Sequence, residues 1–235
     1  MTKKELTALI AHIASTGEHR LPSEEELSAR LEVSRATVRS ALLSLQKSGI
    51  VQRVHGRGTY INRSALRVPA NISEDRAFTD ILREMGHQVS ARSDDIRLGK
   101  APQSMAKTFQ WDDEQKQRVW VVRRHFEASG DPAVYAVDYV PVSLFADGPP
   151  TQGCDSVFDF LRLEAGRQVR YSVADIVPTT PSPEVAAALG VSRKEAILLL
   201  EHTHIDESDE PVAFTQAFIN DKLLRFSVVR TYTDS

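Results

Sequence analysis

Three segments in the first sixty residues have apolar positions three and four apart, the spacing of amphipathic helices. The first apolar stripe consists of Leu6, Leu9, Ile10 and Ile13. Ser23 begins the second segment, because Glu26 follows at the spacing of a capping box. The third begins at Ser34, and its stripe consists of Val38, Ala41, Leu42 and Leu45. Two short helices with so brief a connection predict a helix-turn-helix.

The third segment has an arginine face opposite its apolar stripe. Arg35 and Arg39 are four residues apart, so they share one side of a helix, and Ser34 and Thr37 add hydroxyl groups near it. A helix of this kind can lie in a DNA major groove, where arginine donates to guanine or to phosphate. A solvated helix with two surface arginines is the alternative interpretation.

The stretch RVHGRGTY, residues 53–60, lies between two segments with strand character, 50–54 and 59–61. Its glycines suit a phosphate-binding loop, a plain hairpin turn or a basic finger. A phosphate loop runs from a strand into a helix, usually as GxGxxG, whereas here a strand follows GxG. The order therefore favours a hairpin.

A helix-turn-helix followed by a hairpin is a winged helix, and residues 21–61 resemble the GntR family of bacterial repressors. The segment is LPSEEELSARLEVSRATVRSALLSLQKSGIVQRVHGRGTYI. The resemblance implies that the third helix contacts an operator through Ser34, Arg35, Thr37 and Arg39. It implies a wing over the adjacent backbone and minor groove, formed by Arg53, His55, Gly56, Arg57, Gly58 and Thr59.

One position departs from that family. The family usually has arginine where this chain has Glu25, inside the acidic run 24–26. A carboxylate cannot donate a hydrogen bond and is repelled by phosphate. Either the operator differs from the family's common sequence, or the grip on DNA depends more on Arg35, Arg39 and the wing.

After the winged helix, residues 64–73 lack a clear period and are predicted to be a linker, followed by a second domain over 74–235. Helices are expected over 73–85, 103–107, 156–164 and 183–189. Strands are expected over 88–97, 118–127, 133–140, 169–177, 196–206 and 211–219. Because most of these strands are joined by turns, the pattern predicts an α+β fold with an antiparallel sheet.

This order of elements resembles the UTRA effector domain of the HutC branch, which shares the chorismate-lyase fold. The matching segments are SGDPAVYAVDYVP, SVFDFL and PSPEVAAALGVSRKEAILLLEHTHIDESDEPVAF, and the branch's phosphonate regulators look similar. Sugar-phosphate-binding relatives hold phosphate with an R-x-R pair, which falls here on Arg124 and Phe126. The resemblance implies further effector contacts at Ser156, at Phe158, where tyrosine is common, and at Ala213, often glutamate.

These departures exchange polar groups for apolar surface, so we expect a ligand less polar or less charged than a hexosamine phosphate. The ligand class predicted is a small anionic metabolite, such as a phosphorylated, phosphonate or carboxylate compound. Arg124 lies among apolar neighbours in its strand and needs an anionic partner. That partner is either a ligand anion or a carboxylate of the protein itself.

Other chemistry is not expected. His202, His204 and Asp206 alternate along one strand and either form a facial metal site or are the solvated end of that strand; the second interpretation is favoured. Spacing supports no Ser/His/Asp set and no paired carboxylates, so no catalytic residue, metal or cofactor is predicted.

The distribution of charge indicates different partners for the two parts of the chain. Residues 1–63 carry a net charge of +4, and the remaining residues carry −7, which favours an acidic partner for the N-terminal part alone. Cys154 is the only cysteine, and the longest apolar run, 196–200, is too short to span a membrane. With no signal peptide pattern at the N-terminus, the cytoplasm is the expected compartment.

The sequence therefore predicts a homodimeric transcription regulator, in particular a repressor, that binds palindromic operator DNA and responds to a small molecule. No enzymatic activity and no membrane partner are expected. Two alternatives remain: a lyase-type enzyme with a DNA-tethering head, and a constitutive DNA-binding dimer that takes no ligand.

Overall fold

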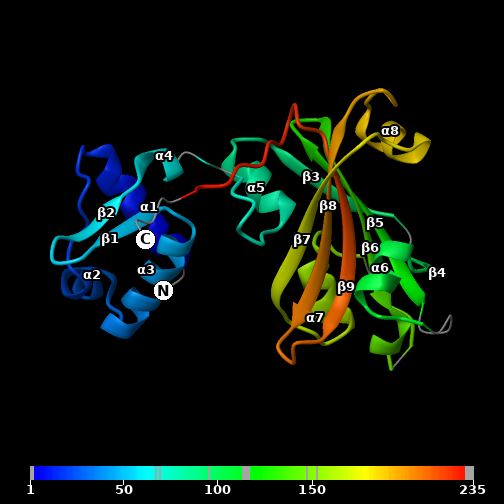
Figure 1. Ribbon diagram of the computed structural model, residues 1–235, viewed down its shortest axis with the longest axis horizontal. Coiled ribbons are helices and arrows are strands. Elements are labelled where there is room, and N and C mark those ends of the chain that lie inside the picture. The colour runs from blue at the N-terminus through cyan, green and yellow to red at the C-terminus, as the bar shows by residue number, and fades with distance from the viewer. Residues whose placement is uncertain are drawn as a thin grey trace. The chain divides into compact units, whose positions relative to one another are not determined.

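The computed structural model describes residues 3–66, 68, 70–94, 96–112, 117–146, 148–151 and 153–230. It forms two compact units. The N-terminal unit extends to Glu74 and includes the C-terminal segment from Phe226 onward, and the second unit is Asp75–Arg225 (Figure 1).

The N-terminal unit packs three helices and a hairpin around one apolar core. Its elements are α1 (Lys3–Ser15), α2 (Glu24–Leu31), α3 (Arg35–Lys47), β1 (Val51–Val54), β2 (Gly58–Ile61) and the short α4 (Arg63–Leu66). The core consists of Leu6, Ile10, Ile13, Leu21, Leu27, Val38, Leu42, Leu45, Val51 and Ile61. The apolar stripes of the sequence thus meet in the interior, and the winged helix-turn-helix is confirmed.

Local hydrogen bonds set the ends of α2 and α3. Ser23 and Glu26 form the predicted capping box: Ser23 Oγ accepts from Glu26 N at 3.2 Å, and Ser23 N donates to Glu26 Oε2 at 2.8 Å. Ser34 Oγ caps α3 by accepting from Thr37 N at 3.1 Å. Between the two helices, Glu32 adopts a left-handed conformation with φ 53°, which turns the chain sharply.

The region predicted as a linker is partly structured. It begins with the helical turn α4, where Arg63 Nη2 donates to Ala14 O at 2.7 Å. Further on, Asn71 forms an isolated parallel bridge with Ser227, and Ser227 N donates to Ala70 O at 2.9 Å. Residues 226–230 therefore lie in the N-terminal unit, although the sequence placed them in the second domain.

The second unit is an antiparallel sheet with helices on both faces. Its strands are β3 (Val89–Ser93), β4 (Arg97–Lys100), β5 (Arg118–Ala128), β6 (Asp131–Pro141), β7 (Val169–Thr179), β8 (Ile197–Asp206) and β9 (Pro211–Ile219). Its helices are α5 (Phe78–Glu84), α6 (Gln103–Thr108), the 3₁₀ turn η1 (Val142–Leu144), α7 (Val157–Glu164) and α8 (Pro183–Leu189). The strand order is β3-β5-β6-β9-β8-β7, with β4 also paired to β5, so the predicted α+β class is confirmed (Figure 1).

Side chains alternate along each strand and divide the sheet into two buried faces. On one face, Met105 of α6 and Leu189 of α8 pack with Tyr135 and Phe214. On the other, Phe160 and Leu161 of α7 pack with Val122. The second face also carries Arg124, two residues along β5 from Val122, and we call it the Arg124 face.

Two predicted elements are wrong in extent. The strand expected over 88–97 is divided into β3 and β4, and the register of pairing with β5 shifts by one residue between them: Ser93 opposes Arg124, whereas Arg97 opposes Val121. The helix expected from Ser73 begins only at Phe78. There the Asn71 side chain accepts from Ser73 N at 3.1 Å, a local bond that competes with helix formation.

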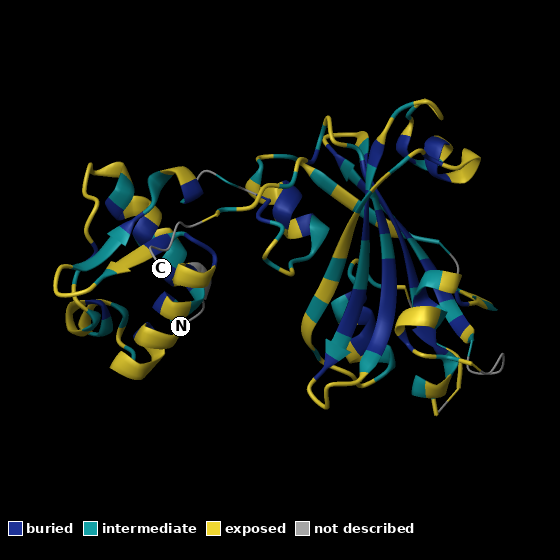
Figure 2. Cartoon of the chain, in the orientation of Figure 1, coloured by how far each residue is buried: buried dark blue, intermediate teal, exposed yellow. Residues whose placement is uncertain are grey.

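Strand β7 lies at one end of the strand order and is the most exposed of the long strands, as Figure 2 shows. Its large apolar side chains Tyr171, Val173 and Ile176 are exposed. Among the described residues, β7 pairs only with β8. An exposed strand edge of this length can pair with another strand.

Candidate functional site

The arginine face of α3 is anchored from behind and open in front. Val38 and Leu45 are fully buried, which fixes the helix against α1 and α2. Arg35 and Arg39 remain about three-fifths exposed, with side-chain exposures of 60% and 58%. At the helix start, Ser34 Oγ lies 2.8 Å from Thr37 Oγ1, so both predicted hydroxyls cluster beside the exposed first turn.

Glu24 joins α2, α3 and the hairpin, a role that sequence spacing did not reveal. Its Oε2 accepts from Arg39 Nε at 3.0 Å and from Nη2 at 2.8 Å, and its Oε1 lies 3.8 Å from Arg53 Nη1. The hydrogen bond from Arg39 is the main reason why the pKa of Glu24 lies below its ordinary value. These contacts hold Arg39 while its Nη1 and one hydrogen on Nη2 stay free of Glu24 for another acceptor.

Glu25 lies directly beside α3. Its Oε2 is 3.7 Å from Arg35 Nη1, and both side chains are exposed. The position that departs from the family therefore adds a negative charge next to an arginine expected to contact DNA. An exposed pair of this kind is weak, so it can be exchanged for a contact with phosphate.

The hairpin presents a basic tip with a fixed backbone. Gly56 and Gly58 have φ of 70° and 108°, conformations that other residues rarely adopt, and His55 and Arg57 are exposed between and beside them. Arg57 N donates to Val54 O at 3.0 Å, which closes the turn. Arg53 pairs with Thr59 across the strands. RVHGRGTY is thus a hairpin, and the phosphate-loop interpretation is excluded.

Arg20 is a further basic residue at the hairpin. It forms an isolated bridge with Tyr60, and a Cβ added to Gly58 would lie 3.0 Å from Arg20 Nε. Arg20 precedes the helix-turn-helix by sequence, so only the three-dimensional pairing shows that it belongs beside the hairpin.

In the second unit, Arg124 has a partner within the protein. Its side chain is 2% exposed and forms an ion pair with Asp138, which is equally buried. Arg124 Nε donates to Cys154 O at 2.6 Å, and the guanidinium lies 5.6 Å from the centre of the Phe160 ring. Burial lowers the pKa of Arg124 to about 10, so the group stays charged at neutral pH. The anionic partner of Arg124 in the structure is therefore a carboxylate of the protein itself, and not a ligand anion.

A directed chain of hydrogen bonds leads from the Asp138 carboxylate across the sheet. Thr215 Oγ1 donates its only hydrogen to Asp138 Oδ1 at 2.6 Å, so it must accept from His204 Nε2 at 2.9 Å. With its proton on Nε2, His204 accepts at Nδ1 from Ser172 Oγ at 2.7 Å. Desolvation by burial lowers the pKa of His204 to about 3, which keeps the ring neutral. We call Ser172, His204, Thr215, Asp138 and Arg124 the polar chain.

The other predicted effector residues lie around this chain with different roles. Phe158 contacts His204 edge-on, with ring centres 5.6 Å apart, and Ala213 is fully buried opposite His204 in the β8–β9 pair. Phe126 instead packs on Phe78 of α5 at 5.5 Å. Ser156 caps α7, accepting from Asp159 N at 3.1 Å. The structure therefore brings Arg124, Phe158 and Ala213 to the polar chain but directs Phe126 and Ser156 to packing and capping.

The favoured interpretation of His202, His204 and Asp206 is wrong. His204 and Asp206 are 2% and 3% exposed, so this end of the strand is not solvated. His204 belongs to the polar chain, while Asp206 Oδ2 accepts from Arg167 Nη1 at 3.0 Å. Within the described part of the chain, no three histidine, cysteine or acidic side chains are grouped as metal ligands would be.

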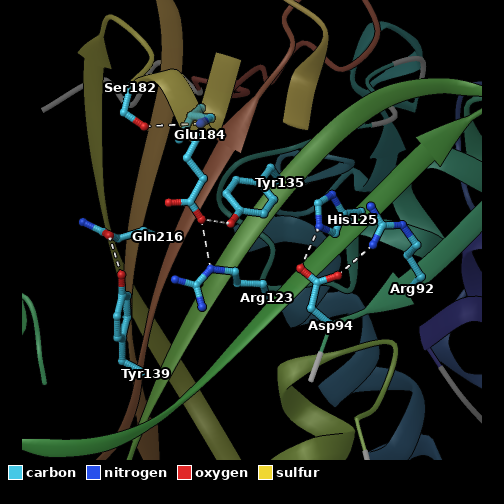
Figure 3. Close-up of polar contacts among 10 residues, drawn as sticks. Arg92, Asp94, Arg123, His125, Tyr135, Tyr139, Ser182, Glu184 and Gln216 are labelled. Carbon is cyan, nitrogen blue, oxygen red and sulfur yellow. Dashed lines mark hydrogen bonds and ion pairs between the residues drawn. The ribbon is translucent and has the colours of Figure 1, made fainter. Parts of the chain in front are cut away.

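The opposite face carries a second polar cluster, which the sequence did not predict (Figure 3). Glu184 of α8 accepts from Arg123 Nε at 2.9 Å and from Tyr135 Oη at 2.6 Å. Asp94 accepts from Arg92 Nη1 at 2.7 Å and lies 3.3 Å from His125 Nε2. An open hollow of about 390 Å³ adjoins it, lined by Ser93, Asp94, Arg97 and Arg123. Because Glu184 pairs with Arg123 and Asp94 lies beside His125, both on β5, the cluster fastens α8 and the end of β3 to that strand.

Comparison with known proteins assigns both units. Residues 1–61 match the model of the bacterial regulatory proteins of the GntR family, and residues 59–223 match that of the UTRA domain. None of the described helices is long and apolar enough to cross a membrane.

Several curated regulators are similar over most of the chain. The transcriptional regulator Rv0792c of Mycobacterium tuberculosis is 26% identical over 89% of this chain and 77% of its own length. The mannosyl-D-glycerate system repressor MngR of Escherichia coli is 27% identical over 76% and 72%. The histidine utilization repressor of Pseudomonas putida is 29% identical over 77% and 67%.

Solved structures share the fold. YydK from Bacillus subtilis superimposes with a TM-score of 0.73 at 19% identity, covering 98% of this chain and all of that one. PhnF from Mycobacterium smegmatis has a TM-score of 0.57 at 20% identity over 99% and 100%. With both domain models matched in order along the sequence, the chain belongs to the GntR family of transcription regulators, in the branch that carries a UTRA effector domain.

Proposed function

We propose that this regulator is a homodimeric repressor that binds a palindromic operator through α3 and the hairpin. The observation that carries the proposal is that Arg35 and Arg39 are exposed on α3 and that Glu24, which binds Arg39, also lies near Arg53 of the hairpin. The DNA contacts proposed are those predicted from the sequence, with Arg20 added beside the hairpin. Two relatives, MngR and the histidine utilization repressor, are named as repressors, which supports the repressor assignment.

Glu24 has a positioning role in this proposal. A guanidinium fixed from one side keeps a defined direction for its remaining donors, which is what bidentate recognition of a guanine or a phosphate requires. Glu24 supplies that fixation for Arg39 and lies near Arg53 of the hairpin. We infer that the helix and the hairpin dock on DNA as one surface.

The dimer is proposed to form through the second unit. The open edge of β7 and its exposed apolar side chains offer a surface for a second copy of the chain. We further propose that a small molecule on the Arg124 face selects between two arrangements of the paired heads, only one of which fits the two half-sites. The polar chain is proposed to serve recognition and not catalysis, and the site of action is proposed to be the cytoplasm.

Selection from a random duplex pool with the full-length protein tests the proposal. The expected result is an enriched inverted repeat bound by two protein copies, as measured by sedimentation of the complex. Enrichment of a single half-site bound by one copy would contradict the homodimer, and no enrichment would contradict sequence-specific binding.

The result also separates the alternatives. A lyase-type enzyme must turn over a small acid without DNA, so catalytic turnover by the wild-type chain would favour that alternative. A constitutive regulator would bind the enriched duplex with one affinity whatever metabolites are added.

A further inference from the structure

The Arg124 face holds a charge pair where a ligand anion would otherwise be required. A buried guanidinium needs a negative partner, and Asp138 supplies it from the neighbouring strand β6, with both side chains 2% exposed. Cys154 O accepts from Arg124 Nε, and the Phe160 ring lies beneath the guanidinium. The positive charge on this face is therefore already neutralised by the protein.

The polar chain also determines which hydrogen-bonding groups remain available to a ligand. Each hydrogen in it is donated toward Asp138, from Ser172 through His204 and Thr215. The only hydroxyl hydrogen of Ser172 is used by His204 Nδ1, so Ser172 Oγ can offer further ligands nothing but lone pairs. Ser172 lies on the partly exposed strand β7, at the outer end of the polar chain.

The side chain of His202, on the same face, has a buried polar atom without a hydrogen-bond partner among the described residues. This atom is His202 Nε2. The His202 ring stacks on that of His204, with centres 5.8 Å apart and planes within 2°. Desolvation by burial lowers the pKa of His202 as well as that of His204, so the ring bonded to Ser172 and the ring stacked on it are both neutral. Neither ring offers a charge to a phosphate or a carboxylate.

We propose that Asp138 takes the place of a ligand anion at Arg124, and that the effector of this regulator is uncharged where it meets the polar chain and donates a hydrogen bond there. A neutral hydroxyl or amide group at that point fits this description, whereas a phosphate group does not. The proposal rests on the effector site proposed above, and it differs from the anionic ligand class predicted from the sequence.

The test uses inorganic phosphate and formate as probes, because formate matches the carboxylate that Asp138→Ala removes. Melting temperatures of the full-length wild type, Asp138→Ala and Arg124→Met/Asp138→Ala are measured in each anion, against chloride at equal ionic strength. We expect no anion-specific shift for the wild type. We expect Asp138→Ala to gain roughly 5 °C or more near saturation. In that variant, Arg124 Nη2, which has no hydrogen-bond partner among the described residues, is the donor available to the anion.

The double variant should lose this response. An Arg124-dependent shift of the wild type with phosphate would overturn the proposal, because an anion would then compete with Asp138. A folded Asp138→Ala that ignores both anions would also overturn it. If Asp138→Ala does not fold, calorimetric titration of the wild type and Arg124→Met with phosphate still decides the question, since equal absence of binding supports the proposal and Arg124-dependent binding overturns it. Binding of the same samples to the enriched duplex is measured separately, so a failure of DNA recognition is distinguishable.

Discussion

Glu25 is the residue at which the sequence resemblance predicts a departure from the family's DNA-binding pattern. It lies 3.7 Å from Arg35 and is exposed, so it lowers the positive potential of the α3 face without being needed for the fold. We expect Glu25→Arg to bind the selected duplex about fivefold more tightly at low salt, and the slope of log K against log salt to steepen by about 0.9 if one phosphate contact is added.

Fluorescence anisotropy over a range of salt concentrations measures this effect. Glu5→Arg on α1 is the matched control, because it makes the same charge change on a helix with none of the predicted DNA contacts. If Glu25→Arg and Glu5→Arg gave the same affinity and slope, Glu25 would not face DNA.

Glu24 should make the stability of the N-terminal unit depend on pH. Its folded pKa lies below the ordinary value of 4.5, chiefly because of the hydrogen bond from Arg39. The stabilisation is therefore complete above about pH 4.5 and is lost as the pH falls through the lower folded pKa. Urea unfolding at pH 7 and below pH 4.5 should show a smaller pH effect for Glu24→Gln than for the wild type. Equal pH effects would mean that the carboxylate adds nothing.

Breaking the Arg124–Asp138 pair should lower the free energy of unfolding strongly, whereas replacing both residues by apolar ones should lower it little. Arg124→Met leaves the Asp138 charge buried and unpaired, which typically costs about 3–5 kcal/mol, whereas Arg124→Met/Asp138→Leu should restore most of the loss. Arg123→Met, which removes a partly exposed pair on the opposite face, should cost about 1 kcal/mol or less. Chemical unfolding of the full-length chain measures all three, and a small loss for Arg124→Met would contradict the buried pair.

The hairpin is proposed to contact DNA as a unit, with Arg57 at its exposed tip. We expect Arg57→Ala to weaken binding to all duplexes alike. The slope of log K against log salt should become shallower by the amount that corresponds to about one phosphate contact. Arg225→Ala in the second unit, where the side chain is 78% exposed, is the control for removing one positive charge. An unchanged salt slope for Arg57→Ala would leave the hairpin an ordinary turn.

Local sequence signals predicted the elements well where those signals are complete. The range 183–189 was correct because Ser182 caps α8, Pro183 occupies its first turn, and Gly190 ends it with φ 63°. The break between β3 and β4 has no such signal, since it depends on a one-residue change in the register of their pairing with β5.

The same distinction holds for the candidate sites. Arg35 and Arg39 could be assigned to one face from their spacing, but the link from Arg39 to Glu24 bridges fifteen residues of sequence. Arg124 was recognised as a charge that needs a partner. Its pairing with Asp138 depends on the register of β5 with β6, which no spacing rule supplies.

Across the whole molecule, charge and function divide together. The residues with a net positive charge form the unit proposed to contact DNA, and the acidic remainder forms the sheet with the polar chain. The C-terminal segment does not follow this division by sequence, because Ser227 pairs with Asn71 in the N-terminal unit. The chain therefore enters and leaves the sheet domain through that unit.

The central claim is that the exposed arginines of α3 recognise the operator. Fluorescence anisotropy with the selected duplex should show Arg35→Ala or Arg39→Ala weakening specific binding by about 1–3 kcal/mol, or roughly 5- to 150-fold. Arg30→Ala, an exposed arginine near the end of α2, should change it by less than about twofold. If both α3 variants bound the duplex as tightly as the wild type, α3 would not be the recognition helix.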